Sequence, residues 1–469
     1  MARRAVVIGS GPNGLVAAIE LARAGFLVEV HEAAEEPGGG LRTAALTLPG
    51  FVHDVCSAIH PLAVASPALR DLDVDWVHPD APLAHPFDDG AAVVVERSLD
   101  ATARGLGVDE AAYRRLFQPL LDAWPDLADL RPLRAGRVIG IRRPLAALAA
   151  ATTFARKRFR DERTRALFAG NAAHSMLPLE RRPTAGFAVA LLTMGHAVGW
   201  PFPRGGASRL TDALVARLSE LGGVVRTSSP VDELPAADLV LADVAPRELV
   251  RIARGRLPAR YERELLRYRH GPGAFKLDWA LSAPIPWRAP EVARAGTVHL
   301  GGTLAELALS EREPWAGRPA ERPFVLLAQQ GRFDASRGQT AWAYCHVPNG
   351  FTGDMTEGIE AQVERFAPGF RELVLARHRI DPAAFAEHNR NLVGGDLNNG
   401  AMDLRQLFFR PARRLVPYRT PLRGVYLCSA STPPGGGVHG MCGYSAARVA
   451  LKDLRGGASR YRRLRSSSP

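Results

Sequence analysis

AVVIGSGPNG, residues 5–14, is the stretch from which the fold of this 469-residue chain can be predicted. Its first four residues are apolar and predict a short, buried, parallel strand. Gly9, Gly11 and Gly14 then supply a G-x-G-x-x-G spacing. In this pattern the glycines allow a tight turn, a close approach of the backbone to a pyrophosphate, and close packing of the next helix on the strand. Residues 15–24 carry the apolar face of that helix, whose N-terminus would face the anion.

A second predicted strand supports this interpretation. Residues 26–31 lead to Glu32, which lies 23 residues after Gly9. An acid at this point is placed to accept a hydrogen bond from a ribose 2′-hydroxyl, and it disfavours a 2′-phosphate. A glycine-rich turn in another kind of α/β sheet is the alternative, but strand, turn, helix, strand and acid all occur in the expected order. The sequence holds no second unit of this kind, so we expect one bound dinucleotide with a dedicated domain.

Length and composition predict a cytoplasmic protein of two or three domains. Hydrophobic residues make up 46% of the chain and the mean hydropathy is −0.08, which is typical of a soluble globular protein. The N-terminal MARR leads directly into the first strand, so no signal peptide is expected. The cysteines lie far apart without metal-binding spacing, which favours reduced thiols and no metal site. They are Cys56, Cys345, Cys428 and Cys442.

Positive charge is concentrated in two segments. The formal net charge is +12; residues 131–165 carry eleven basic and two acidic residues, and residues 455–469 add five arginines and no acid. Because no recognised nucleic-acid-binding module accompanies these residues, no nucleic-acid partner is expected. The uncharged stretch 144–155 lies between basic residues. This arrangement fits peripheral contact of a helix with an anionic membrane, or equally an ordinary amphipathic helix with solvated arginines.

A second glycine cluster follows the predicted ribose acid. Gly39 and Gly40 precede Arg42, and small residues beside an arginine can line a phosphate. A flexible turn with a surface arginine is the simpler alternative. Small residues within 51–61 could lie flat under a planar ring, whereas His60 in the same segment is expected to be structural rather than catalytic.

The rest of the chain predicts an interrupted α/β domain and a second domain. Residues 184–203 carry no formal charge apart from a possible proton on His196, but glycines and prolines in their second half predict a buried helix and a turn, and so a wall of an apolar substrate tunnel. Strands that end at Val231 and near Asp243 then restore α/β character, and later segments predict a mainly antiparallel sheet. The other predicted elements are helices at 211–221, 359–378 and 443–452, and strands at 275–281, 324–330, 340–348 and 425–428.

These motifs together resemble the phytoene-desaturase-like flavoproteins, within the wider group that includes amine oxidases. The resemblance extends over nearly the whole chain, through AVVIGSGPNGLVAA, EEPGGGLRT, FPRGGASRL, FKLDWAL, VGGDLNNGA and STPPGGGVHGMCG in this order. It implies an α/β fold with a discontinuous Rossmann-type FAD-binding domain, a second α+β substrate domain and a helical lid. The corresponding boundaries are 1–75, 204–250 and 415–469 for the FAD-binding domain, 76–203 for the helical insert, and 251–414 for the substrate domain.

The same resemblance implies a set of FAD contacts. The opening turn would hold the pyrophosphate, Glu32 the adenosine ribose, and Val231 the adenine through its backbone. The second glycine cluster would lie along the ribityl and phosphate side, and the closing motif would cover the ribityl chain and the isoalloxazine edge. The implied contacts are Gly9, Ser10, Gly11, Asn13 and Gly14 of the opening turn, Gly39, Gly40 and Arg42 of the cluster, and Ser431, Gly440 and Met441 of the closing motif.

Two features depart from this family. Only DELPAADL separates the strands near Val231 and Asp243, where the family often has a β-meander. Ser429 and Ala430 stand where the closing motif often carries Gly-Asp. These departures leave the adenine contacts open, and they mark a divergent chain whose substrate need not be a carotenoid.

The activity implied by the resemblance is dehydrogenase or desaturase chemistry, in which two electrons leave an apolar or amphipathic substrate by hydride transfer to FAD. Oxygen or a quinone is the expected acceptor. The cofactor does the chemistry, and the protein orients a C–H bond and excludes water. A base could take the accompanying proton. The candidates are His439, Lys276 and Asp396, although Lys276 is expected to pair with an acid and Asp396 to form a turn. An FAD-dependent amine oxidase and a redox-silent FAD-binding protein or isomerase are the alternatives.

Overall fold

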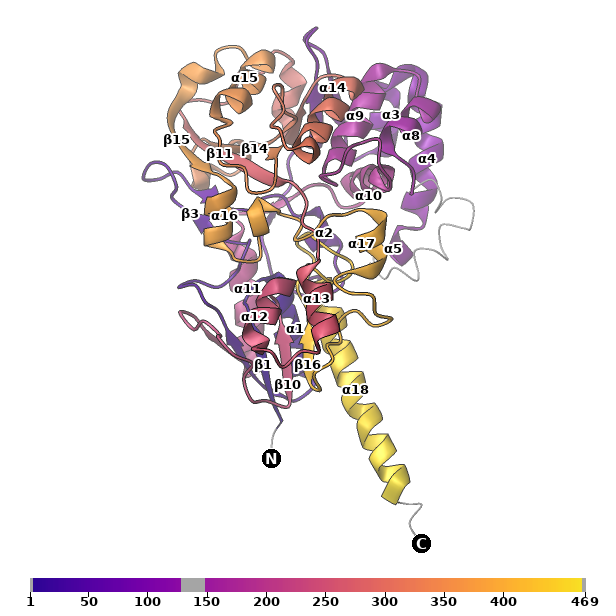
Figure 1. Ribbon diagram of the computed structural model, residues 1–469. Helices are drawn as coiled ribbons and strands as arrows, with labels where there is room; N and C mark the ends of the chain where they lie inside the picture. Colours follow the sequence, from indigo (N-terminus) through magenta and orange to yellow (C-terminus); the bar gives the residue numbers. More distant parts are fainter. Residues whose placement is uncertain (1–2, 128–147, 466–469) are drawn as a thin grey trace.

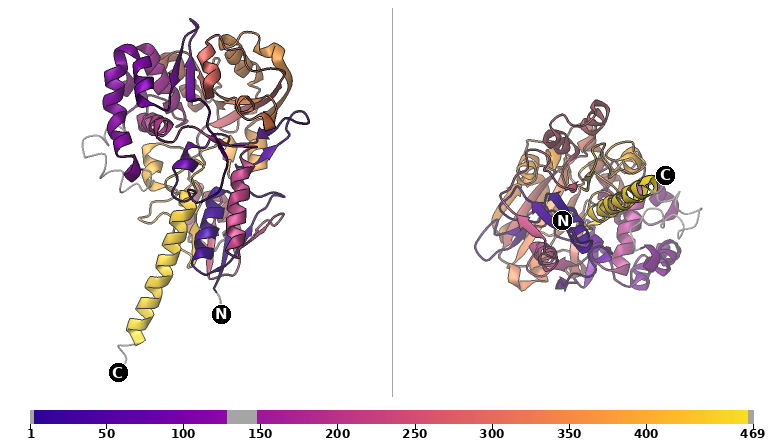
Figure 2. Two further views of the ribbon diagram at one scale, coloured as in Figure 1. Left: turned by 180° about the vertical axis from the view of Figure 1, so that it is seen from behind. Right: turned by 90° about the horizontal axis from the view of Figure 1, so that it is seen from below.

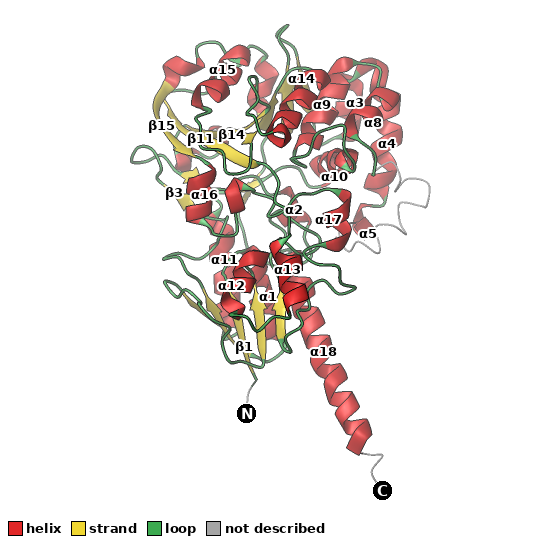
Figure 3. Ribbon diagram, viewed as in Figure 1, coloured by secondary structure: helices red, strands yellow, loops and turns green. Residues whose placement is uncertain are grey.

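The opening stretch forms the centre of a parallel sheet, drawn in the lower part of Figure 1 and as yellow strands in Figure 3. The structure is a computed structural model that describes residues 3–127 and 148–465, with side chains described for residues 3–125 and 148–455. The strand order is β16-β10-β1-β2-β9, and all four pairings are parallel. The strands are β1 (Arg4–Ile8), β2 (Leu27–His31), β9 (Val224–Arg226), β10 (Leu239–Ala242) and β16 (Val425–Leu427). The predicted α/β, Rossmann-like fold is therefore confirmed, with strands from three separate parts of the chain.

Helices cover both faces of this sheet because the side chains of β1 alternate between them. Ala5 and Val7 pack with the helices of one face, whereas Val6 and Ile8 pack with those of the other. The first face carries α1 (Pro12–Arg23), α11 (Ser208–Glu220) and α18 (Met441–Arg465), and the second carries α12 (Pro246–Ala253) and α13 (Ala259–Leu266). Helix α18 continues beyond the sheet and projects away from the body near the N-terminus (Figures 1 and 2). Since α12 and α13 pack on this sheet, the layer extends past the expected boundary at residue 250.

A second, larger sheet lies above the first, in the order β15-β11-β14-β13-β12-β6-β7. It is antiparallel except for the parallel pair of β6 and β12, as the sequence predicts for a mainly antiparallel sheet. Two of its strands come from the segment expected to be a helical insert, because the apolar, β-branched residues near Val93 favour a strand. The strands are β6 (Ala81–Pro86), β7 (Ala92–Val95), β11 (Gly273–Leu281), β12 (Ala295–Leu300), β13 (Val325–Ala328), β14 (Thr340–Val347) and β15 (Val374–Ile380).

The two faces of the second sheet differ in chemistry. One face is apolar and packs on α15 (Thr356–Phe366), through residues such as Val298 and Leu327. On the other face, His299 pairs with Leu326 and Leu326 with Tyr344, so these side chains form one row across three strands. The next row contains Thr297, Ala328 and Trp342. This second face carries the polar and aromatic side chains that reach the candidate site.

A helical layer covers the polar and aromatic face of the second sheet (Figure 1). The predicted apolar helix is α10, which ends at Ala197 before Gly199 and Pro201, so the glycine and prolines stop it as expected. Within residues 3–127 and 148–465, no helix is long and apolar enough to cross a membrane. The helices are α3 (Leu99–Gly105), α4 (Glu110–Asp122), α5 (Trp124–Leu127), α8 (Ala151–Arg158), α9 (Glu162–Ala173), α10 (Thr184–Ala197) and α14 (Leu304–Arg312).

The basic segments stay partly outside the described residues. Arg142 and Arg143, which flank the uncharged stretch on one side, lie there, as do the side chains of the tail beyond Arg455. Helix α8 is present and buries Ala151 and Ala155 against its neighbours. Contact of this segment with a membrane therefore stays a prediction, as does the alternative of an ordinary amphipathic helix.

Two local predictions are wrong. The helix expected over 359–378 ends at Phe366, and the following residues form β15, because Gly369 at φ 90° breaks the helix and an alternating VLARHRI strand then pairs with β11. The strand expected to reach Val231 ends at Arg226, so Val231 lies in a loop. The remaining elements are β3 (Thr43–Ala44), β4 (His53–Asp54), β5 (Trp76–Val77), β8 (Phe202–Pro203), α2 (Pro61–Ala65), α16 (Pro382–His388) and α17 (Leu404–Phe409).

Candidate functional site

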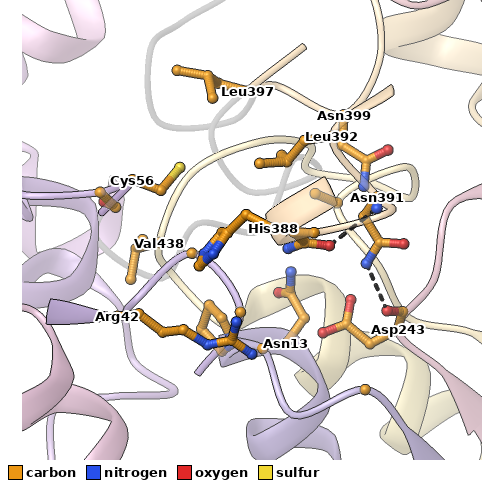
Figure 4. Close-up of a pocket in the computed structure, with 18 of the residues that line it drawn as sticks. Asn13, Arg42, Cys56, Asp243, His388, Asn391, Leu392, Leu397, Asn399 and Val438 are labelled. Atoms are coloured by element: carbon orange, nitrogen blue, oxygen red, sulfur yellow. Dashed lines mark hydrogen bonds between the residues drawn. The ribbon is translucent and has the colours of Figure 1, made fainter. Parts of the chain in front are cut away.

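A cavity of about 580 Å³ connects the two sheets. Its nucleotide end lies at the carboxyl edge of the parallel sheet, where ligands bind in open α/β folds. Its substrate end lies against the polar and aromatic face of the second sheet. The nucleotide end is lined by Gly9, Gly11, Glu32, Arg42 and Asp243, and the substrate end by Leu191, Trp200, Leu326, Trp342 and Tyr344. Figure 4 shows the nucleotide end, with Asn13, Arg42 and Asp243 around the opening.

The glycines of the opening turn are required by close contacts. Gly9 has φ 94°, and a Cβ there would lie 2.9 Å from the Asp243 carbonyl oxygen. A Cβ on Gly14 would lie 2.1 Å from the Gly9 carbonyl oxygen, which no side chain can tolerate. The turn therefore brings the start of α1 directly beneath the cavity. This helix begins with a Gly-Pro pair at the cavity wall, so its positive N-terminal end faces the space where an anion would lie.

Glu32 is held rigidly at the end of β2. Its carboxylate accepts hydrogen bonds from the Ser10 backbone N–H at 2.9 Å, from the Ser10 hydroxyl at 2.6 Å and from the Ala34 N–H at 3.0 Å. The Arg42 guanidinium lies 3.7 Å from the Glu32 Oε1 atom. Because the carboxylate also lines the cavity, it is oriented for a further donor such as a ribose hydroxyl.

Asp243 is a functional candidate, although the sequence pattern around it indicates only the end of a strand. It follows β10, which pairs with β1, so its carboxylate enters the same edge of the sheet. One oxygen accepts the Gly14 N–H at 2.9 Å. Burial, opposed by the Gly14 hydrogen bond and aided by the charge of Glu32, raises the pKa of this carboxyl to about 7. The position after a second parallel strand was the signal that could have identified it.

A loop from the second domain closes over the nucleotide end. Asn391 accepts the Ala245 N–H at 2.6 Å and donates to the Asp243 backbone carbonyl at 3.0 Å (Figure 4). His388, at the end of α16, also lines the cavity, and burial lowers its pKa, with the charge of Arg42 acting in the same direction. No local sequence motif indicates these residues, because their loop reaches the site only in the folded chain.

Four buried polar atoms at this end lack a partner within the described part of the chain. They all belong to residues that line the cavity, and a buried polar atom without a partner costs free energy unless a ligand satisfies it. The atoms are Asn13 Oδ1, Arg42 Nε, His388 Nε2 and Asn399 Oδ1. Together with the start of α1 and the fixed Glu32, they fit a dinucleotide with an anionic centre and a hydroxylated sugar.

The implied cofactor contacts divide into two groups. Those that line the cavity are Gly9, Gly11, Asn13, Glu32, Gly39, Gly40, Arg42 and Val231. Those that lie behind the wall are Ser10, Gly14, Ser431, Gly440 and Met441. The closing motif instead presents Ala430, Gly437 and Val438 to the cavity. Gly440 and Met441 pack on α1 or begin α18, so they support the opening turn rather than line the site.

His439 does not line the cavity. Its ring Nδ1 accepts the Met441 N–H at 3.0 Å, and its Nε2 lies 3.2 Å from the Gly435 carbonyl. Burial lowers the pKa of this histidine to about 4. Since both ring nitrogens are engaged in shaping the closing loop, the geometry gives no support to His439 as a base.

Lys276 and Asp396 are also held by partners away from the cavity wall. Lys276 is buried in an ion pair with Asp278, as its sequence context predicts, and its Nζ lies 5.6 Å from the centroid of the Trp342 ring. Asp396 accepts three backbone N–H bonds, including one from Gly271 at 2.8 Å. Both residues therefore shape the surroundings of the site, and neither reaches its interior.

The substrate end is mainly apolar with aromatic walls. Trp342 and Tyr344 are stacked with their centroids 5.6 Å apart, and α10 supplies Leu191 opposite them. His174, which caps the C-terminus of α9, also lines this end. His60 lines the cavity at the start of α2, where burial lowers its pKa to about 4 and its Nε2 contacts the Ser57 hydroxyl at 3.2 Å.

Known proteins share both the opening domain and the overall fold. The family model described as an NAD(P)-binding Rossmann-like domain matches residues 7–72. The chain is 27% identical to a mouse protein named "Pyridine nucleotide-disulfide oxidoreductase domain-containing protein 2", over 96% of this chain and 94% of the mouse protein. It is 30% identical to the phytoene dehydrogenase of Streptomyces griseus, over 52% of this chain and 51% of that enzyme.

A solved structure of putrescine oxidase with putrescine bound has a similar fold. It superposes with a TM-score of 0.62 at 17% identity, covering 97% of this chain and 99% of the oxidase. This similarity establishes the shared fold. The family model thus covers a Rossmann-like dinucleotide-binding domain at the start of the chain, and the similar proteins are oxidoreductases by name.

Proposed function

We propose that this protein is an FAD-dependent oxidoreductase that removes two electrons from an apolar or amphipathic substrate. The observation that carries the proposal is the continuous cavity, which joins an anion-binding turn at Gly9 and Gly11 to an apolar, aromatic end at Trp342. A dinucleotide and a hydrophobic molecule could thus lie in contact within one continuous cavity. The mouse relative and the phytoene dehydrogenase are both oxidoreductases by name, which supports the same class.

The residues present fit FAD at the nucleotide end. The start of α1 and the Asn13 side chain would hold the pyrophosphate, Glu32 a ribose hydroxyl, and Arg42 a phosphate or the ribityl side. When bound, FAD supplies an acceptor for two electrons and a proton equivalent. The single dinucleotide unit of the chain favours oxygen or a quinone, rather than NAD, as the next acceptor.

The residues of the substrate end would orient the substrate and exclude water. Leu191, Trp200 and Leu326 offer apolar surface, so burial of a hydrophobic body would supply the binding free energy. A dry, fixed wall keeps a reacting C–H bond in one orientation and protects a reduced cofactor from side reactions. In a desaturation, a hydride would pass from one carbon to FAD and a proton from the adjacent carbon to solvent, which leaves a C=C bond between the two carbons.

An FAD-dependent amine oxidase is the second candidate. The stacked pair of Trp342 and Tyr344 at the substrate end favours it, because aromatic walls also suit amines, and the putrescine oxidase shares the fold. The two candidates differ in their products. An amine oxidase acting on oxygen releases peroxide from amines, whereas a desaturase forms a C=C bond in a molecule without an amine.

The test begins with purification of the full chain and measurement of its flavin absorbance, followed by reconstitution with FAD. The loaded protein is then mixed without oxygen with panels of terpenoid lipids, amines and polyketide-like phenols. Bleaching of the flavin by lipids supports the proposal, and bleaching by amines supports the second candidate. Oxidised flavin that persists across all three panels would favour a redox-silent or isomerase role and contradict the proposal.

A further inference from the structure

Two histidines, the buried His299 and the half-buried His174, form a pair at the substrate end. His174 stands at the C-terminus of α9 and lines the cavity, and His299 lies on β12 in the row with Leu326 and Tyr344. Their Nε2 atoms are 3.0 Å apart. A contact of this length between two ring nitrogens requires one to donate and the other to accept, so a single proton lies between them.

The surroundings fix this pair in place. A Cβ on Gly170 of α9 would lie 2.8 Å from His299 Nδ1, so the His299 ring rests against the helix where only glycine leaves room. The indole of Trp200 packs edge-on against both rings, with centroids 5.6 Å from His174 and 6.0 Å from His299. Since His299 engages Nε2 of His174, the Nδ1 atom of His174 is the ring nitrogen left for a ligand in the cavity.

Both histidines are held in the neutral form. Burial lowers the pKa of His174 to about 3, and the charge of His346 acts in the same direction. Burial also lowers the pKa of His299 far below its usual value, with His174 and His85 contributing. His346 is itself paired with the buried Glu311 at 2.8 Å. At neutral pH, His174 therefore offers an uncharged ring that either donates or accepts through Nδ1, according to its tautomer.

Charged groups are segregated away from this pair. Among the described residues that line the cavity, the acids are Glu32, Asp243, Glu248 and Glu387. All belong to the elements of the nucleotide end or to α16, which closes over it. The polar groups that line the substrate end beside His174 are neutral, notably Thr297, whose buried hydroxyl has no partner within the described chain. A cationic head group placed beside His174 would lose its hydration without gaining a counter-charge.

We propose that the His174–His299 pair recognises a single neutral hydroxyl or carbonyl group on an otherwise apolar substrate. Nδ1 of His174 contacts that group, and His299 is a positioning residue that fixes the ring and its tautomer. A hydroxyl or carbonyl satisfies the ring in one tautomer or the other, whereas an ammonium would face a neutral, apolar wall. That the bound molecule is oxidised rests on the proposed function. Its recognition by the histidine pair does not, because recognition can be measured as binding alone.

The test compares octan-1-ol, octan-2-one and octylamine, which is protonated at pH 7, as ligands of the purified, FAD-loaded protein. Binding is measured by calorimetry and by quenching of tryptophan fluorescence, since Trp200 and Trp342 line the cavity. We expect the alcohol and the ketone to bind about tenfold more tightly than the ammonium ion, the factor of one net hydrogen bond. Equal affinities, or tighter binding of octylamine, would overturn the proposal.

Two variants of His174 separate its two ring nitrogens. In H174Q the side-chain amide lies near the position of Nε2, so it still contacts His299 but leaves no polar atom at the position of Nδ1. The affinity for octan-1-ol should therefore fall about tenfold. In H174N the amide lies near Nδ1, and the preference for the alcohol should be retained within about threefold. H78Q, at an exposed histidine outside the cavity lining, is the control and should bind like the native protein.

The positioning role of His299 is tested by H299L and its conservative partner H299Q. The leucine should weaken binding of octan-1-ol several-fold, and the glutamine should restore most of it, which a purely structural role would not require. Comparison of the three ligands on the native protein remains informative even where a variant fails to fold. Alcohol selectivity in a protein that takes up no FAD would support this inference while contradicting the proposed function. A protein that binds FAD but shows no preference for the alcohol would contradict this inference and leave the proposed function standing.

Discussion

The two ends of the cavity are built in different ways. The nucleotide end is made of turns and helix starts, whose glycines and unpaired polar atoms leave places for a ligand. The substrate end is made of side chains on a sheet and two helices, and two of its contacts are direct side-chain pairs, His174 with His299 and Trp342 with Tyr344. Backbone geometry thus dominates one end and side-chain chemistry the other. A substitution should therefore affect the binding of one ligand class and spare the other.

The largest expected effect lies in the opening turn. In G14A the new methyl group would meet the Gly9 carbonyl at 2.1 Å, so the turn and the start of α1 must separate. We expect the affinity for FAD to fall more than about 100-fold, together with a lower melting temperature, because backbone cannot yield as a side chain can. Fluorescence titration with FAD and a thermal melt provide the measurements.

G105A is the matched control for this prediction. Gly105 lies in α3, where a Cβ meets nothing within 4 Å, so alanine should leave FAD binding unchanged and raise helix stability slightly. If G14A retained native affinity for FAD, the assignment of the opening turn to the cofactor would be wrong.

A smaller effect is expected from the titration of Asp243. Its pKa of about 7 means that the carboxyl is neutral at pH 6 and charged at pH 8, where it would repel a nearby pyrophosphate. The affinity for FAD should therefore fall about tenfold between these values, and D243N should remove this part of the pH dependence. Identical pH profiles for the native protein and D243N would contradict the prediction.

The same residue predicts how the stability of the cofactor-free protein depends on pH. Its pKa is raised from 3.8, so between about 4 and about 7 the folded chain holds a proton that the unfolded chain has released. Its contribution to stability is therefore complete below pH 4 and is lost as the pH rises to 7. Melting temperatures across this range should fall more steeply for the native protein than for D243N.

The smallest effect is expected at the substrate end, from G170A. The added methyl would press on His299 Nδ1 at 2.8 Å and tilt the pair, so binding of octan-1-ol should weaken about three- to fivefold with FAD binding unchanged. G195A is the control, because its Cβ would meet its nearest neighbour, Trp200, at an ordinary 3.5 Å. A G170A protein with native alcohol affinity would show that the pair tolerates displacement and does not position the ligand.

The same contrast explains what the sequence could predict. The opening turn, Glu32 and the parallel strands follow from local patterns, because turn chemistry and apolar runs act over a few residues. The closing motif is expected to contact the cofactor through Ser431, Gly440 and Met441, but none of them lines the cavity. Gly440 lies against Val16 of α1, and Met441 begins α18. A Cβ on Gly443 would lie 1.8 Å from the Asn13 carbonyl, so the close approach of α18 to α1 accounts for the glycines there.

The substrate end could not be predicted because it depends on pairing between distant residues. His174 and His299 are 125 positions apart, and neither lies in a motif. Conversely, His439 lies in a conspicuous glycine-rich loop, but both of its ring nitrogens contact backbone groups of that loop. A histidine beside glycines is thus a weak indication of catalysis, since a tight loop also needs its donors and acceptors satisfied.

The central claim is that the turn at Gly9–Gly14 and the second domain together enclose one FAD beside an apolar substrate space. Its most direct test is reconstitution of the full chain with FAD, followed by measurement of the bound flavin per chain and of its affinity. The account predicts saturable binding of one FAD per chain that is lost in G14A and retained in G105A. A colourless protein that takes up no FAD, or uptake that G14A leaves intact, would contradict it.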